Sequence, residues 1–162
     1  MLLALIALVQ LAVAQSPPQA AAPPAVDRDA IVAVVQKFFD AIEKRDPALA
    51  KQAMLPEGQV VAVSDQNGTP VPRARTAQQF ADGLANATGD SLERMWNPDV
   101  RVQGGIGTLW TRYDFHRGGT FSHCGVDAFN LVKTADGWRI ASVMYTIERT
   151  NCPPSPLGPP KK

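Results

Sequence analysis

Three side chains that could transfer protons lie close together in the second half of the chain: Asp114, His123 and Asp127. A carboxylate beside an imidazole fixes its tautomer and makes it more basic, and desolvation raises the pKa of a carboxyl group in a partly apolar pocket. Either group could then move a proton in an isomerisation or a water elimination on a small hydrophobic substrate. Arg112 or Tyr113 could act as the oxyanion partner.

A structural interpretation of the same residues stays open. Asp114 and His123 could be a cross-strand pair at the rim of a sheet, contributing about 0.2–1 kcal/mol to stability, and Asp127 could hydrogen-bond a helix end. The other histidine, His116, sits at a predicted turn, where we expect it to be solvated, so it is left out of the candidate site.

The candidate residues fall on a series of predicted antiparallel strands. The connections between the strands contain glycine pairs or an Ala-Asp-Gly sequence, which tolerate the positive φ of tight turns. The predicted strands are Ser91 to Asn97 continuing irregularly to Gln103, Ile106 to His116, Thr120 to Thr134, and Trp138 to Arg149.

Three helices and a weak hairpin are predicted before these strands. Asp27 and Asp46 are typical N-caps, and Thr76 with Gln79 forms a capping box. The predicted elements are a helix from Asp27 to Lys44, a short helix from Pro47 to Ala53, a hairpin with strand Gln59–Val63, turn Gln66–Thr69 and edge or loop Pro70–Pro72, and a helix from Thr76 to about Ala87. This order predicts an α+β domain with helices against one face of a strongly curved antiparallel sheet.

The turns also predict which side chains share a face, because side chains alternate along a strand and two-residue loops fix the pairing. One face is expected to be ionisable at one end and aromatic or aliphatic at the other, and to line a pocket. The ligand-contacting residues predicted on this face, beside Asp114, His123 and Asp127, are Trp110, Arg112, Phe129, Trp138, Met144 and Thr146.

The opposite predicted face is also apolar, with Tyr113, Phe115, Val143 and Tyr145 among its side chains. An exposed apolar patch of a few hundred Å² usually marks an interface, so a homodimer packed sheet to sheet is expected. The alternative is that the two faces are exchanged, because a single-residue bulge inverts every side chain beyond it.

Several short motifs in the last strands resemble a known superfamily: Trp110, Tyr113–Phe115, His123–Asp127 and Asp136–Ile140. With the order of elements from Val26 to Glu148, the chain resembles the nuclear-transport-factor-2-like superfamily, which includes ketosteroid isomerase, scytalone dehydratase and SnoaL-like cyclases, and within it the branch labelled "putative lumazine-binding". The resemblance implies a cone-shaped fold, a pocket between helices and sheet, and often a homodimer. It implies no single reaction, since the superfamily includes isomerases, dehydratases, cyclases and binding proteins.

Composition and the termini define the rest of the chain. The 162 residues suffice for one domain, and the formal charge of +1, without a basic stripe, makes nucleic acid an unexpected partner. The predicted divisions are an export signal at residues 1–14 (or a buried N-terminal helix), a Pro/Ala-rich linker at 15–25, the domain at 26–152 and a Pro-rich disordered tail at 153–162. An exported protein, periplasmic or secreted and not bound to a membrane after signal cleavage, is the expectation.

The cysteines and histidines leave two further questions. Cys124 and Cys152 invite a disulfide in an exported chain, but the assumed register separates them unless the chain turns back after Asn151. His116, His123 and Cys124 lack the spacing of a ligand set, so neither a metal nor another cofactor is expected.

Two classes of function remain open from the sequence. The preferred one is an exported domain that holds a small flat or hydrophobic ligand in a cone-shaped pocket. The alternative is an acid-base isomerase or a dehydratase (lyase) that uses the same residues and no cofactor.

Overall fold

The computed structural model describes residues 24–160, so the predicted signal at 1–14 and nearly all of the predicted linker lie outside the described residues. The helices are α1 (Ala25–Lys44), α2 (Pro47–Ala53) and α3 (Ala77–Ala85). The strands are β1 (Met54–Gln66), β2 (Thr69–Thr76), β3 (Ser91–Gln103), β4 (Ile106–Arg117), β5 (Thr120–Thr134) and β6 (Gly137–Ile147). None of the described helices is long and apolar enough to cross a membrane.

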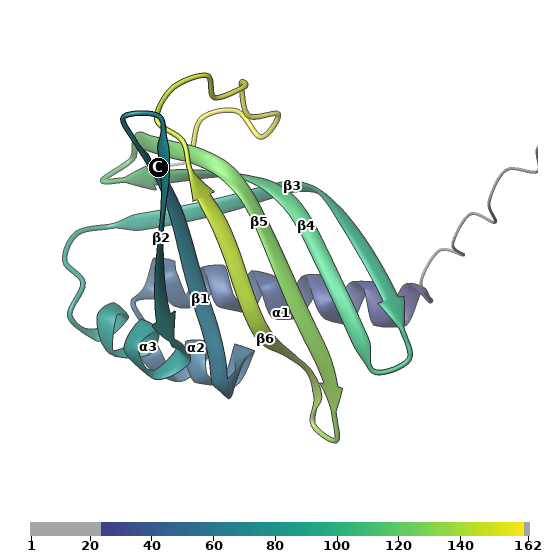
Figure 1. The fold of residues 1–162 in the computed structure, drawn as a ribbon. Coiled ribbons are helices and arrows are strands. Elements are labelled where there is room, and N and C mark those ends of the chain that lie inside the picture. Colours follow the sequence, from purple (N-terminus) through teal and green to yellow (C-terminus); the bar gives the residue numbers. More distant parts are fainter. Residues whose placement is uncertain (1–23, 161–162) are drawn as a thin grey trace, which may run out of the picture.

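The strands form one curved sheet with the order β2-β1-β6-β5-β4-β3. Figure 1 shows the sheet bending over α1, with α2 and α3 below the β1–β2 end. The predicted α+β architecture is therefore confirmed. The sheet is mixed rather than wholly antiparallel, because the last strand of the meander, β6, returns beside β1 and runs parallel to it.

Local capping signals place the helices where the sequence predicts them, with one exception. Asp46 caps α2, and the Thr76–Gln79 capping box opens α3. Helix α1 begins earlier than expected, with Pro24 at its N-cap. The Asp27 carboxylate instead accepts hydrogen bonds from Trp138 Nε1 at 3.0 Å and Lys133 Nζ at 2.7 Å, which tie the first turn of α1 to the β5–β6 hairpin.

The hydrophobic core fills the space between the helices and the concave face of the sheet. Ile31, Val35 and Phe39 of α1 are almost completely buried there, and Phe129 and Leu131 of β5 face them. Apolar side chains at three- and four-residue steps bury one stripe of α1. This packed region occupies the end of the cone nearest the β5–β6 turn.

Two β-bulges change the faces that the sequence predicts. Ser122 is an extra residue in β5, because Phe115 pairs with His123 while His116 pairs with Phe121. Ala141 is an extra residue in β6, because Leu131 pairs with Ile140 while Asn130 pairs with Ser142. Each bulge inverts the side chains beyond it relative to the neighbouring strand.

The prediction that Asp114 and His123 lie opposite each other on one face is consequently wrong. Asp114 pairs with Cys124, which bridges to Glu148, and all three belong to the convex face. His123 lies on the concave face beside Phe115. The alternative that the faces are exchanged holds for β4 and for β6 beyond its bulge, while β5 has the predicted faces.

Cys124 and Cys152 form a disulfide, with their Cα atoms 5.9 Å apart. The chain turns back after β6 at Asn151, whose φ is 59°, and this return brings the two cysteines together. The Pro-rich segment that follows has no helix or strand among its described residues. Arg94 Nη2 donates a hydrogen bond to the Gly158 carbonyl oxygen at 2.9 Å, which holds this segment against β3.

Candidate functional site

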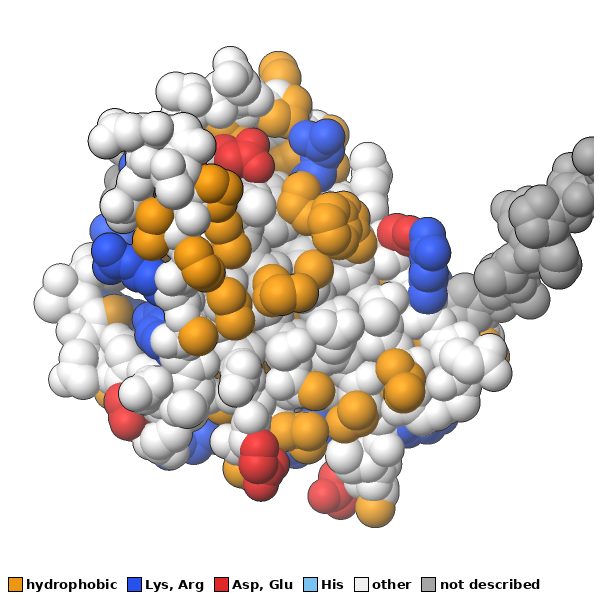
Figure 2. Space-filling model, viewed as in Figure 1, with side chains coloured by type: hydrophobic (Ala, Val, Ile, Leu, Met, Phe, Trp, Pro, Cys, Tyr) orange, Lys and Arg blue, Asp and Glu red, His pale blue; other side chains and the backbone are white. Residues whose placement is uncertain are grey.

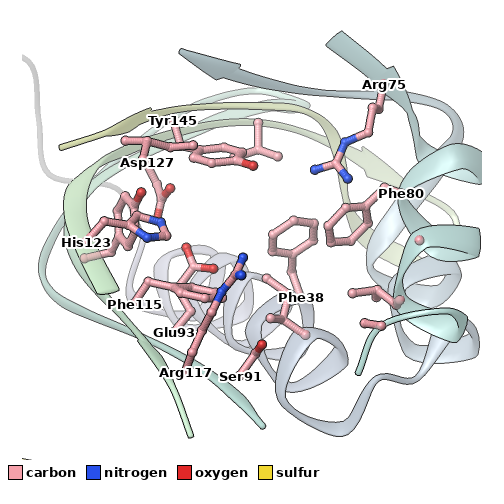
Figure 3. A pocket seen from close by; sticks show the side chains of 17 residues that line it. Phe38, Arg75, Phe80, Ser91, Glu93, Phe115, Arg117, His123, Asp127 and Tyr145 are labelled. Carbon is pink, nitrogen blue, oxygen red and sulfur yellow. The ribbon is translucent and has the colours of Figure 1, made fainter. Parts of the chain in front are cut away.

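A cavity of about 250 Å³ lies between the concave face of the sheet and helices α1 and α3. Ligand pockets commonly measure about 300–1,000 Å³. This cavity lies just below that range and therefore suits a ligand of small size. Figure 3 shows its labelled side chains converging from the helices and from strands across the sheet, between its edge strands β2 and β3. Its polar and aromatic lining residues are Phe38, Arg75, Phe80, Ser91, Glu93, Tyr113, Phe115, Arg117, His123, Asp127 and Tyr145.

Aromatic rings form opposite walls of the cavity. Phe38 of α1 stacks on Phe80 of α3 with ring centroids 4.8 Å apart and an angle of 11°. On the sheet side, Phe115 stacks on His123 at 4.8 Å. Tyr145 of β6 lies above the space between these walls (Figure 3). Aromatic rings on both walls favour a flat guest, because stacked or edge-to-face contacts add to the burial of apolar area.

Asp127 is the most buried polar group of the cavity, with 1% of its surface exposed. Its Oδ2 atom has no hydrogen-bond partner among the described residues. Burial, followed by the charge of Glu93, raises the pKa of Asp127 well above its usual value. Burial therefore favours the protonated carboxyl group, and a ligand oxygen could accept its proton in a hydrogen bond.

Glu93 is a second acid that faces the same space. It pairs across the sheet with Phe115, which directs its side chain toward the concave face. Burial, with a further contribution from the charge of Asp114, raises the pKa of Glu93 to about 8. Two carboxyl groups of one cavity thus retain protons at a pH where exposed carboxyl groups are ionised.

His123 is uncharged in this environment. Burial, followed by the nearby charges of Arg149 and Arg117, lowers the pKa of His123 to about 4. Its Nδ1 lies 3.1 Å from Ser122 Oγ. No described carboxylate pairs with the ring, so His123 contributes a neutral aromatic wall rather than an activated imidazole.

Tyr113 forms part of the wall but has its hydroxyl group engaged. The hydroxyl donates a hydrogen bond of 2.6 Å to the Thr146 carbonyl oxygen. Gly125 makes this approach feasible, because a Cβ there would clash with both the Thr146 carbonyl oxygen and the Tyr113 ring. Burial is also the main cause that raises the pKa of Tyr113 beyond its usual range.

Two arginines stand at the rim of the cavity. Arg75 of β2 and Arg117 of β4 are both exposed while lining it. The Arg75 guanidinium lies 5.7 Å from the centre of the Phe80 ring, and the Arg117 guanidinium lies 5.8 Å from that of Phe115. Burial raises the pKa of Tyr145 while the Arg75 charge acts in the opposite direction.

Two of the three predicted proton-transfer residues, His123 and Asp127, line the cavity. The third, Asp114, lies on the other face, where Arg94 donates two hydrogen bonds to it, at 2.9 and 2.6 Å. Burial alone would raise the pKa of Asp114, but the hydrogen bonds from Arg94 and Ser155 and the Arg94 charge lower it. His116, expected to be solvated, is buried with its Nε2 3.4 Å from Asp114.

The predicted ligand-contacting residues do not line the cavity. Trp110, Arg112 and Met144 are exposed on the convex face, where their strands are inverted relative to the prediction. Phe129 and Trp138 face the helices as predicted, but they belong to the packed core. The Thr146 hydroxyl accepts a hydrogen bond from the Val126 amide at 3.1 Å and donates one to Glu148 at 3.0 Å.

The sequence interpretation missed Glu93, the rim arginines, and Phe38, Phe80 and Tyr145 as cavity residues. Side chains alternate between the two faces of a strand, so the predicted strand from Ser91 could have been used to place Glu93 on one face and Arg94 on the other. No local signal identifies the arginines, because Arg75 reaches the cavity only through the long-range pairing of the β1–β2 hairpin with β6. Within residues 24–160 no group of His, Cys, Asp or Glu side chains is arranged to hold a metal ion.

The curved sheet, the helices that cover its concave face and the cavity between them are typical of the nuclear-transport-factor-2-like fold. A family model described as "Putative lumazine-binding" matches residues 26–146. The chain belongs to this family, within the nuclear-transport-factor-2-like superfamily, which confirms the resemblance drawn from its motifs. No curated protein matches the sequence.

Solved structures share the fold at low sequence identity. A nuclear-transport-factor-2-like superfamily protein from Salmonella enterica is 18% identical, with a TM-score of 0.62 over 78% of this chain and 94% of that one. A protein of the same type from Novosphingobium aromaticivorans is 15% identical, with a TM-score of 0.62 over 78% and 85%. A "putative dehydratase" from Streptomyces avermitilis is 16% identical, with a TM-score of 0.60 over 77% and 98%. These likenesses show the fold alone.

Proposed function

We propose that the protein is an exported binding domain whose cavity holds a small flat ligand. The observation that carries this proposal is the Asp127 carboxyl group, which is buried in the cavity with one oxygen unpartnered. Leaving such a group without a hydrogen bond costs about 1–3 kcal/mol. A ligand oxygen that accepted its proton would remove this cost, while the stacked rings at Phe38 and Phe115 covered the ligand's faces.

Blocking the mouth of the cavity tests the proposal. Gly83 lines the cavity from the exposed side of α3, so Gly83→Phe places a ring in the mouth without disturbing the core. Ala85→Phe is the matched control, because Ala85 is exposed on the same helix but does not line the cavity. We expect calorimetry to detect 2-naphthamide binding to the parent and to Ala85→Phe, and not to Gly83→Phe. Equal binding to all three proteins would place the ligand elsewhere and refute the proposal.

A second candidate function is acid-base isomerisation or dehydration, favoured by two buried acids with raised pKa values in one cavity. Glu93, once ionised, would remove a proton next to a carbonyl group, while Asp127 in its protonated form donated to the carbonyl oxygen. One protein of similar fold is described as a "putative dehydratase". This function predicts conversion of a β,γ-unsaturated cyclic ketone to its conjugated isomer, followed by absorbance. Asp127→Asn should abolish turnover but retain binding, and turnover unchanged in Asp127→Asn would exclude this role.

Export and dimerisation are further parts of the proposal. Disulfides persist in oxidising compartments, so the Cys124–Cys152 bond favours an exported protein. Figure 2 shows hydrophobic side chains spread over the outer face of the sheet. Trp110, Phe121 and Met144 are 58%, 46% and 48% exposed, and we infer that a second copy of the chain covers them.

A further inference from the structure

The rim and the interior of the cavity differ in charge. Arg75 and Arg117 approach the cavity from β2 and β4, and both guanidinium groups are exposed. Neither makes an ion pair with any residue between 24 and 160. The Arg75 guanidinium lies over Phe80 and the Arg117 guanidinium over Phe115, two rings of the cavity walls, and Arg75 also interacts with the uncharged hydroxyl of Tyr145. The rim therefore presents positive charge that the chain itself does not neutralise.

The interior offers hydrogen-bond donors rather than compensating negative charge. An ionised carboxylate is costly in a low-dielectric site unless it is paired. Asp127 is nearly completely buried with an unpartnered oxygen, and no arginine or lysine of the described chain bonds to it. In its protonated form, which burial favours, Asp127 carries no charge and can donate to a ligand oxygen. Glu93, the other acid of the lining, has a pKa of about 8 and is mostly protonated at pH 6.5, so the two acids do not cancel the attraction of the rim for an anion.

We propose that the ligand is a flat organic anion, a conjugated or aromatic carboxylate, whose carboxylate lies at Arg75 and Arg117 and whose ring extends toward Asp127. This inference rests on the proposed binding function and adds the charge class of the ligand. The recognition is local, because the formal charge of the whole chain is only +1. Arginine suits this role, since its planar donors match a carboxylate and its face stacks on aromatic rings.

Three probes with the same naphthalene ring and substituents of similar size but different charge test the inference. We expect the parent protein to bind 2-naphthoate about tenfold more tightly than 2-naphthamide, because a hydrogen bond to a charged group contributes about 1.5–3 kcal/mol and about 1.4 kcal/mol is tenfold in affinity. The cationic 2-naphthylmethylamine should bind more weakly than both. Calorimetry at pH 6.5 in low salt measures all three, and the preference for the anion should decrease as salt is added.

Arginine variants locate the effect. Arg75→Gln and Arg117→Gln should each weaken 2-naphthoate binding about tenfold and leave 2-naphthamide binding unchanged. The matched control is Arg73→Gln, because Arg73 is exposed on β2 two residues from Arg75 but does not line the cavity. It should leave both affinities unchanged.

The outcomes separate the inference from the proposal on which it rests. Equal affinity for the acid and the amide, tighter binding of the amine, or an equal effect of Arg73→Gln would overturn the anion preference and leave the binding function standing. Binding of 2-naphthoate and 2-naphthamide that Gly83→Phe leaves unchanged would overturn the binding function itself. If Arg75→Gln bound neither 2-naphthoate nor 2-naphthamide, Arg75 would act by packing in the cavity wall, which would contradict its role as the partner of the ligand's charge.

Discussion

Glu93→Gln should change how the stability of the protein depends on pH. Burial raises the pKa of Glu93 from 4.5 to about 8, so between these values the native state holds a proton that the unfolded state has lost. The unfolding free energy then falls as pH rises, because the native state binds more protons than the unfolded state. Glutamine keeps the size and hydrogen-bonding capacity of the protonated acid but cannot ionise.

The size of the effect follows from the same values. Each pKa unit corresponds to about 1.4 kcal/mol, and integration between pH 5 and pH 8 gives about 3–4 kcal/mol for a group that titrates near 8 in the native state and near 4.5 in the unfolded state. Over this interval the parent protein should lose this amount of stability more than Glu93→Gln does, because the buried Asp127 contributes in the same direction in both proteins. The two proteins should be similar in stability at pH 5.

Urea unfolding at several pH values, followed by circular dichroism, measures the difference. Glu57→Gln is the control, because Glu57 is exposed and distant from the cavity lining. It should have the pH profile of the parent. Parallel profiles for the parent and Glu93→Gln would show that Glu93 ionises normally in the native protein, and would refute the account of a buried proton-holding acid.

Three further outcomes follow from the structure. Asp114→Asn should destabilise the protein by about 3 kcal/mol at pH 7, because it leaves the Arg94 charge unpaired. Since the pKa of Asp114 is lowered, the difference in unfolding free energy between parent and variant should shrink as pH falls through that lowered pKa. A difference that stays constant in urea titrations at acid pH would contradict the ion pair. Cys152→Ser should cost about 3 kcal/mol in non-reducing urea unfolding, since the bond closes a loop with a sequence separation of 28; a loss that persists when both proteins are reduced would assign the effect to something else. Trp110→Glu should convert a dimer to a monomer in light scattering, and a parent protein that is monomeric at high concentration would exclude the sheet-to-sheet interface.

Element positions could be predicted because their signals are local. The Asp46 cap with Pro47 and the Thr76–Gln79 box act within one helical turn, so a short window of sequence contains the whole cause. The tight turn at Gly118-Gly119 lies where expected for the same reason. The parallel pairing of β1 with β6 has no such local cause, since it depends on how the intervening elements pack.

The faces of the strands could be predicted only in part. Ser122 and Ala141 are ordinary residues, and nothing in their types marks the bulges that invert β4 relative to β5 and split β6. His123 and Asp127 were predicted correctly as cavity residues because both lie on β5, which has the predicted faces; the bulges invert β4 and the second part of β6 relative to it. Asp114 was predicted on the wrong face, and its partner is Arg94 rather than His123. Arg94 lies opposite Asp114 because an irregularity in β3 between Trp96 and Asp99 shifts the register set by the Gly104-Gly105 turn.

A crystal structure of the protein with bound 2-naphthoate would show where the ligand lies and which side chains hold it. We expect the naphthalene ring inside the cavity, between Phe38 and Phe115 and beside Tyr145, with the carboxylate toward Arg75 and Arg117. A ligand seated instead on the convex face at Trp110 and Met144, with the cavity lacking ligand density, would contradict it.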